Sequence, residues 1–287
     1  MPVVFVLIWS TGFVVARYGM PHAPPLSFLA WRFALSVLVF AVWILWARPA
    51  WPASRQQWGH LAVTGALLHA GYLGGVWAAV KAGMGAGTVA LLVGLQPVFT
   101  ALWVSSTGQE PRAHARQWWG LLLGLLGLVL VVWRKLGVGE VGAWNLGLAT
   151  FALFSITAGT LYQKRFVGPC DVRTANTVQL LAALVLTAPL AWLETEPMRW
   201  HPQLLGALAW SVLVLTLGGS SLLYLLIQRG AATRVTGLMY LVPPCTALLA
   251  WVLFQEMLAP VTWLGMALTA WGVWWVVRSH AQGGTAR

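Results

Sequence analysis

The chain contains 287 residues, of which 59% are hydrophobic and 8% are charged, and its mean hydropathy is +0.77. This composition leaves too little polar surface to cover a soluble domain, so a water-soluble protein is excluded. Lys and Arg outnumber Asp and Glu by 17 to 6. Because the basic residues stand mostly at the ends of apolar stretches, we attribute the excess to membrane topology rather than to nucleic-acid binding.

Apolar stretches bounded by Pro, Gly or charged residues predict ten membrane spans. They lie near residues 3–19, 27–47, 59–80, 86–106, 117–133, 143–163, 174–193, 204–227, 234–254 and 260–277. They are too long and too continuously apolar for the alternating strands of an outer-membrane barrel, so each is predicted to be a helix. The sixth and seventh are the weakest, since they hold Asn145, Gln163, Asn176 and Gln179. We therefore expect an all-α integral membrane protein with ten transmembrane helices, the first of them a span rather than a removed signal peptide.

The basic residues also predict how these helices are oriented. If the N-terminus is cytoplasmic, the inner segments hold Arg48, Arg55, Arg112, Arg116, Lys164, Arg165, Arg173, Arg229, Arg234, Arg278 and Arg287, and the outer segments hold Arg17, Lys81, Arg134, Lys135 and Arg199. This bias follows the positive-inside rule. It predicts a multi-pass protein of the cytoplasmic (inner) membrane with both termini in the cytoplasm.

The two halves of the chain resemble each other. Aligning residues 86–110 with residues 232–256 without a gap gives the identities Ala86/Ala232, Val89/Val235, Leu92/Leu238, Leu95/Leu241, Pro97/Pro243, Thr100/Thr246, Ala101/Ala247, Leu102/Leu248, Gln109/Gln255 and Glu110/Glu256. Each half holds five predicted spans, an odd number, so the second half must enter the membrane inverted relative to the first. Inverted-topology repeats are typical of secondary transporters. We predict repeats at residues 1–139 and 140–278, followed by a cytoplasmic tail at 279–287.

Several short motifs resemble those of the EamA-type drug/metabolite transporters. They are Trp9-Ser10-x-x-Phe13 with Arg17, Pro24-Pro25 followed by Ala30-Trp31-Arg32, Pro97 and Pro243 within helices, and Gln-Glu before the last span of each half. The resemblance implies ten helices and a central cavity lined by the first, third, fourth, sixth, eighth and ninth. It also implies export of small metabolites or amino acids. The hairpin at residues 111–114 is more polar than its counterpart in the second half.

Polar and aromatic side chains at similar depths on several spans are the candidate substrate contacts, because polar groups inside a bilayer are costly unless they pair or line water. The predicted substrate-binding residues are Trp9, Ser10, Phe13, His69, Tyr72, Gln96, Ser155, Tyr162, Ser220, Tyr224 and Tyr240. Pro97, Pro243 and Pro244 are expected to kink the fourth and ninth helices near mid-depth. For each residue alone, the alternative is a hydroxyl bonded to its own helix or an inert kink.

Three ionisable features bear on the mechanism. His69, deep in a span, is interpreted as a neutral imidazole bonded to a hydroxyl, a substrate contact or a proton carrier. Arg32 is expected to snorkel or to bond helix-end carbonyls in preference to contacting substrate. All six acidic residues lie in loops or at span ends. We therefore expect facilitated diffusion or exchange rather than coupling through a buried carboxylate, and a small, partly apolar, zwitterionic solute such as an amino acid.

Two rival functions are weaker. An intramembrane enzyme would need a nucleophile with a base; Ser220 and His69 are candidates, but no GxSxG or HExxH motif occurs, so we predict that the chain is not an enzyme. A structural subunit leaves the repeat unexplained. We expect no cofactor and no metal site, since Cys170 and Cys245 lack metal-ligand spacing. The expected partners are the lipid bilayer and a small-molecule substrate, without nucleic acid, in a monomer or a homodimer. Gly83-x-x-x-Gly87 and Gly120-x-x-x-Gly124 are interpreted as helix-packing motifs.

Overall fold

The computed structural model of the chain describes residues 2–106, 119, 122–123, 125–127, 139–228, 242–255, 260–261, 263–268 and 271. The regular elements in these ranges are helices. In chain order they are α1 (Pro2–Gly19), α2 (Pro25–Ala47), α3 (Arg55–Gly65), η1 (Ala66–Gly71), α4 (Tyr72–Lys81), α5 (Ala86–Val93), α6 (Gln96–Ser106), α8 (Ala143–Phe166), α9 (Val172–Ala191), α10 (Pro202–Trp210), η2 (Ser211–Ser220), α11 (Ser221–Gln228) and α13 (Val242–Phe254).

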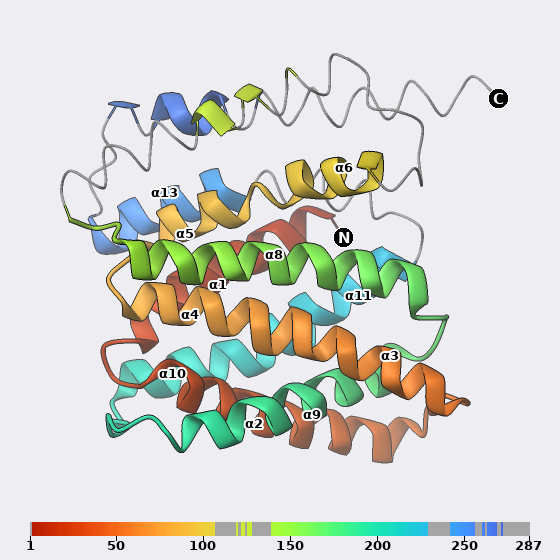
Figure 1. Cartoon of the computed structure of the whole chain (residues 1–287). Helices are drawn as coiled ribbons and strands as arrows, with labels where there is room; N and C mark the ends of the chain where they lie inside the picture. Colours follow the sequence, from red (N-terminus) through yellow and green to blue (C-terminus); the bar gives the residue numbers. More distant parts are fainter. Residues whose placement is uncertain are drawn as a thin grey trace.

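The helices lie side by side and run back and forth between two ends of a bundle (Figure 1). One end, at the left of Figure 1, carries the connections 20–24, 82–85, 139–142 and 192–201, which hold Glu140, Glu194 and Glu196; we call it the glutamate end. The other carries the connections 48–54 and 167–171, and we call it the Asp171 end. Side chains such as Leu45 and Trp46 on α2 are largely exposed, which suits a helix face turned to lipid.

Within the described ranges, five helical segments are long and apolar enough to cross a bilayer: Pro25–Ala47, Arg55–Lys81, Ala143–Phe166, Val172–Ala191 and Pro202–Leu226. The chain is therefore a multi-pass helical membrane protein. The sixth and seventh predicted spans, the weakest by composition, form the complete helices α8 and α9. The predicted span 117–133 lies mostly outside the described residues, as do half of the span 260–277 and the start of 234–254. The count of ten and the inversion of the halves stay predictions.

Two of these segments contain a stretch of π-helix in their middle. η1 interrupts the segment from α3 to α4, and η2 interrupts the segment from α10 to α11. The offset that aligns Ala86 with Ala232 places Ala66–Gly71 within Ser211–Ser220. A π-helical turn widens the helix and occurs often at functional sites, because it redirects the side chains that it carries. His69 lies in η1 and Thr216 in η2.

Glycines set the close packing of η1 and α4 against α8. A Cβ atom added at Gly71 would lie 2.6 Å from Ser155 Oγ, and one added at Gly75 would lie 2.7 Å from the carbonyl oxygen of Leu148. The packing motif is thus Gly71-x-x-x-Gly75, and not Gly83-x-x-x-Gly87. Gly83 instead has φ +94 in the turn after α4, a conformation that glycine adopts without strain. Gly120 and Gly124 lie outside the described residues.

The predicted fourth span consists of two helices. α5 ends at Val93, and α6 begins at Gln96, so Pro97 occupies the first turn of α6, where its missing N–H costs nothing. Pro243 and Pro244 similarly lie in the first turn of α13 as described. A Cβ atom added at Gly94 would lie 2.5 Å from Pro243 Cγ, so the break in the fourth span packs closely against α13.

Candidate functional site

Two small adjoining cavities lie in the middle of the bundle, and both are lined by Trp9, Leu68, His69, Tyr72 and Ser220. We call the two together the central cavity. The larger has a volume of about 30 Å³ and the smaller about 10 Å³. This space holds a few water molecules at most. A solute of amino-acid size therefore requires the helices that line the central cavity to move apart.

Aromatic rings form one wall of the central cavity. The rings of Trp9 on α1 and Tyr72 at the start of α4 are parallel, with centroids 6.3 Å apart. Phe13 and Trp77 continue this wall in the larger cavity. The side chains of Phe13, Tyr72 and Trp77 are buried. These rings offer flat apolar surface to a ligand, and they also carry one phenol hydroxyl and two indole N–H groups.

Arg32 brings a positive charge to the larger cavity. Its side chain is only 3% exposed, and its Nε donates a hydrogen bond of 3.2 Å to Thr216 Oγ1. The Thr216 hydroxyl in turn donates to the carbonyl oxygen of Ser211, 2.8 Å away. Arg32 therefore points into the bundle, and the expectation that it snorkels to the membrane surface is wrong. η2 supplies the hydroxyl that holds it there.

Amide side chains line the smaller cavity. Gln163 comes from α8, and Asn176 and Gln179 come from α9. Asn176 Nδ2 donates to the carbonyl oxygen of Val172 at 2.8 Å. The Nε2 atoms of Gln163 and Gln179 are buried and lack a hydrogen-bond partner among the described residues. Two hydrogen-bond donors on this wall are thus available to a ligand or to water.

The structure places the predicted contact residues in two groups. Trp9, Phe13, His69, Tyr72, Ser220 and Tyr224 line the central cavity. Ser10, Gln96, Ser155 and Tyr162 lie elsewhere, and Tyr240 lies outside the described residues. Five further residues line the central cavity or support a lining residue, although they are not among the predicted contacts: Arg32, Thr216, Gln163, Asn176 and Gln179. Each was visible in the sequence only as a polar residue within an apolar stretch.

The side chains of Ser10, Ser155 and Gln96 make contacts within one helix or between two helices. Ser10 Oγ donates to the carbonyl oxygen of Val6 at 2.7 Å, within α1. Ser155 faces Gly71 where η1 packs on α8. Gln96 Nε2 donates to Thr160 Oγ1 at 3.0 Å and so joins α6 to α8. These three are buried by packing, and none lines the central cavity in the described structure.

Tyr162 and Tyr224 make hydrogen bonds toward the Asp171 end. The Tyr162 hydroxyl lies 2.8 Å from His60 Nδ1, which joins α8 to α3. The Tyr224 hydroxyl lies 2.8 Å from Cys170 Sγ in the connection between α8 and α9. Tyr224 therefore lines the smaller cavity and also bonds the connection between α8 and α9 at the Asp171 end.

The groups around the central cavity do not resemble a hydrolytic site. Ser220 Oγ lies 3.5 Å from the carbonyl oxygen of Leu215, and among the described residues no hydrogen bond joins it to His69. Within the same ranges, His, Cys, Asp and Glu form no cluster of three that could hold a metal ion. The described carboxylates lie at the two ends of the bundle. The chemistry available in the middle is binding through rings, amides, hydroxyls and one guanidinium.

Comparison with protein families gives two matches along the chain. The EamA-like transporter family matches residues 2–133 and again residues 143–278. One solved structure, titled "Crystal structure of protein", superposes with a TM-score of 0.71 over 100% of this chain and 97% of that chain, at 19% sequence identity. That similarity shows a shared fold.

Three curated relatives cover most of the chain. YwfM of Bacillus subtilis strain 168, named a transporter, is 30% identical over 94% of this chain and 91% of its own length. A protein of Escherichia coli strain K12 named "Probable amino-acid metabolite efflux pump" is 25% identical over 94% of this chain and 91% of its length. The inner membrane transporter YedA of the same strain is 26% identical over 93% and 86%.

Proposed function

Because the chain belongs to the EamA-like transporter family, we propose that it exports small metabolites, amino acids or related compounds, by alternating access. Its family and the names of its relatives indicate a membrane transporter of small molecules rather than an enzyme. In our proposal the halves 1–139 and 140–278 are inverted repeats with both termini in the cytoplasm. They rock about the central cavity and expose it to the two sides in turn.

The observation that carries this proposal is the composition of the central cavity. Its walls come from both halves: Trp9 and Tyr72 from the first, Gln179 and Ser220 from the second. In secondary transporters the substrate site lies near the bilayer midplane at the interface between repeats. Relative motion of the two halves would therefore open and close this site directly.

The chemistry of the same walls supports the choice of substrate. Rings such as Trp9 and Tyr72 suit an apolar side chain, whereas amides and hydroxyls suit the polar ends of a small zwitterion. A sugar phosphate would require several inward basic groups, whereas Arg32 is the one Lys or Arg among the described residues that line the larger cavity. The name of the Escherichia coli efflux pump agrees with an exported amino acid.

Among the described residues, no carboxylate lines the central cavity, and this supports transport down the solute's own gradient or by exchange. Proton- and sodium-coupled carriers often place such a group at mid-depth. In proteoliposomes we expect a preset pH gradient to give no uphill accumulation. A proton-coupled flux that persists in His69→Ala would contradict this part of the proposal.

A thermal-shift screen of the purified protein against the standard amino acids tests the function. A ligand that binds the folded state raises the midpoint of unfolding in proportion to its occupancy. Hits are then assayed by counterflow in proteoliposomes. Tyr72→Ala should weaken binding at least about fivefold, since a lost hydrogen-bonded partner costs about 1–3 kcal/mol.

Trp46→Ala is the matched control, because Trp46 is an aromatic residue 84% exposed on the surface of α2. It should leave binding unchanged. If Tyr72→Ala and Trp46→Ala lose ligand binding equally, and both losses match a lower protein yield, the central cavity is not the binding site. If the folded protein catalyses counterflow with none of the amino acids tested, the proposed substrate class is refuted.

A further inference from the structure

The guanidinium of Arg32 is a buried charge for which the described part of the chain provides no carboxylate. Glu140, Glu194 and Glu196 lie at the glutamate end. Asp171 pairs with Arg173 at the opposite end, with 2.7 Å between Nη2 and Oδ2. A charge inside a membrane bundle is costly unless it pairs, and such a residue usually marks a pathway or a binding site. Arg32 therefore calls for an anionic partner from outside the described chain.

Arg32 lines the larger cavity with a side chain rich in hydrogen-bond donors. A guanidinium has five N–H donors in a rigid, planar fork. One of them, on Nε, bonds to Thr216 Oγ1, which fixes the plane of the group. The side chain lines the cavity beside Tyr72 and His69. A fork held in this way matches the two oxygens of a carboxylate better than a lysine ammonium would.

The charge and the aromatic residues of the larger cavity limit the kind of anion that it can bind. The described residues that line the larger cavity include one Arg and no Lys, so they neutralise a single negative charge and not a dianionic phosphate. The aromatic residues beside Arg32 suit an apolar body attached to the anionic group. The buried amide nitrogens of Gln163 and Gln179 add donors on the wall of the adjoining cavity.

We propose that Arg32, positioned by Thr216, binds the carboxylate of the transported solute, so that the substrates are small organic acids with one free carboxylate and an apolar side chain. This inference rests on the proposed function for the location of the site, and it adds the group that the site recognises. It requires the carboxylate of an amino acid and does not require its amine.

The test is a titration of purified protein in detergent by thermal shift with four related probes. L-Phenylalanine and phenylpyruvate carry the carboxylate; L-phenylalaninamide and phenethylamine do not. In the wild-type protein we expect the carboxylates to bind about tenfold or more tightly than the probes without one, as is typical of a charge-assisted hydrogen bond. This comparison needs no variant and so is independent of any folding defect.

Arg32→Gln should weaken the carboxylates about tenfold or more and bring the ratio between L-phenylalanine and L-phenylalaninamide close to one. Arg32→Lys, which keeps the charge and loses the fork, should lie between. Thr216→Val should reduce the ratio while leaving the binding of phenethylamine unchanged, because Thr216 acts through Arg32. A merely structural role for Arg32 would instead weaken all four probes together.

The outcomes separate this inference from the proposed function. Binding of phenylpyruvate but not L-phenylalanine, lost in Arg32→Gln, would support the carboxylate site and count against amino acids. Tight binding of L-phenylalanine that is unchanged in Arg32→Gln would overturn the carboxylate site and leave an amino-acid transporter. If neither carboxylate binds the wild-type protein, the carboxylate site is overturned.

Discussion

The two ends of the bundle join the halves of the chain by different chemistry. At the glutamate end, carboxylates of the second half bind the first half: Glu194 accepts from the backbone N–H groups of Leu26 and Ser27 at 2.9 and 2.7 Å. At the Asp171 end the described hydrogen bonds between the halves join neutral groups, such as His60 with Tyr162 at 2.8 Å and Gln57 Nε2 with the carbonyl oxygen of Gly168 at 3.1 Å.

The carboxylates of the glutamate end cap helices that lack caps of their own. α2 begins after Pro24, whose side chain makes no capping hydrogen bond, and Glu194 satisfies two of the free N–H groups of its first turn. Glu140 does the same for α5, accepting from Gly85 N and from Thr88 Oγ1. A carboxylate at a helix N-terminus gains both from hydrogen bonds and from the helix dipole.

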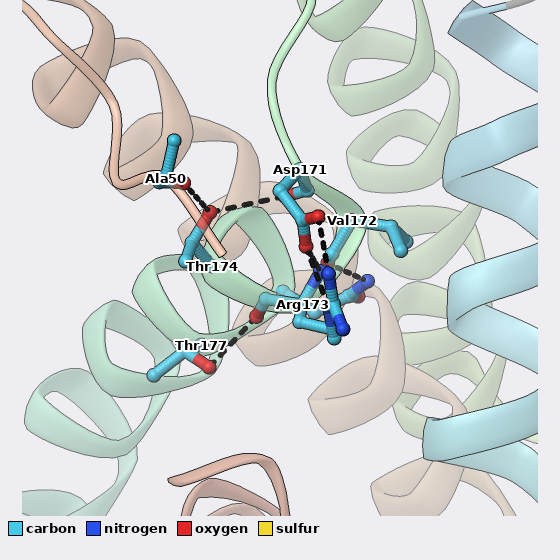
Figure 2. Close-up of polar contacts among 7 residues, drawn as sticks. Ala50, Asp171, Val172, Arg173, Thr174 and Thr177 are labelled. Atoms are coloured by element: carbon cyan, nitrogen blue, oxygen red, sulfur yellow. Dashed lines mark hydrogen bonds and ion pairs between the residues drawn. The ribbon is translucent and has the colours of Figure 1, made fainter. Parts of the chain in front are cut away.

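At the Asp171 end, the carboxylate of Asp171 accepts hydrogen bonds at the start of its own helix and, among the described residues, does not bind the other half. Figure 2 shows Asp171 bonded to the backbone and side chain of Arg173 at the start of α9, so it caps that helix. The bond to the other half in this view is that of Thr174 Oγ1 to the carbonyl oxygen of Ala50, 3.2 Å long. Because hydrogen bonds to a charged group are stronger than neutral ones, the glutamate end is held more firmly than the Asp171 end in this conformation.

The largest expected effect follows from removing Glu194. Glu194→Ala should lower the free energy of unfolding by about 1–3 kcal/mol, because two backbone N–H groups and the Ser27 hydroxyl lose a charged acceptor. The measurement is unfolding by SDS in mixed micelles. Glu196→Ala is the control: it removes a more exposed pair with Lys81, so its loss should be about 1 kcal/mol or less. Equal losses would show that capping of α2 is not what strengthens this end.

A smaller effect is expected from Tyr162→Phe at the other end. It removes only the hydroxyl that meets His60, and a neutral hydrogen bond contributes about 0.5–1.5 kcal/mol. If Tyr162→Phe loosens the Asp171 end, Cys170 becomes more accessible and should react faster with N-ethylmaleimide. The rate is measured in a Cys245→Ser background, so that Cys170 is the thiol that reacts. If Glu194→Ala accelerates Cys170 alkylation more than Tyr162→Phe does, the two ends are not independent and the comparison fails.

The smallest effect concerns the pH dependence of Asp171. The hydrogen bonds from Arg173 hold the pKa of the Asp171 carboxyl below its ordinary value. A lowered pKa in the folded state stabilises the protein above the unfolded-state pKa, and the contribution disappears as the pH falls through the folded-state pKa. Wild type should therefore exceed Asp171→Asn in stability at pH 7, by a small amount because the pair is partly exposed, and the difference should disappear as the pH falls through the folded-state pKa. A difference that grows on acidification would contradict the pairing.

Much of the candidate site was predictable from residue type. Six residues that the sequence predicts as contacts, because they are polar or aromatic and lie at similar depth, line the central cavity: Trp9, Phe13, His69, Tyr72, Ser220 and Tyr224. Ser10 and Ser155 satisfied the same criterion but serve packing, because the direction of a side chain around its helix depends on the neighbouring helix. Arg32 was misplaced for a related reason: its depth suggested snorkelling, whereas a hydroxyl on η2 holds it inward.

The sequence by itself determined the membrane environment, the helical class and the family, because each depends on properties that are summed along the chain. Hydropathy over about twenty residues decides whether a segment crosses a bilayer, whatever it packs against. Only the tertiary structure decided which polar groups meet, such as Glu194 with the start of α2 or Arg32 with Thr216. Those pairs lie 168 and 184 residues apart, and no local pattern encodes a contact that forms only when two distant helices pack together.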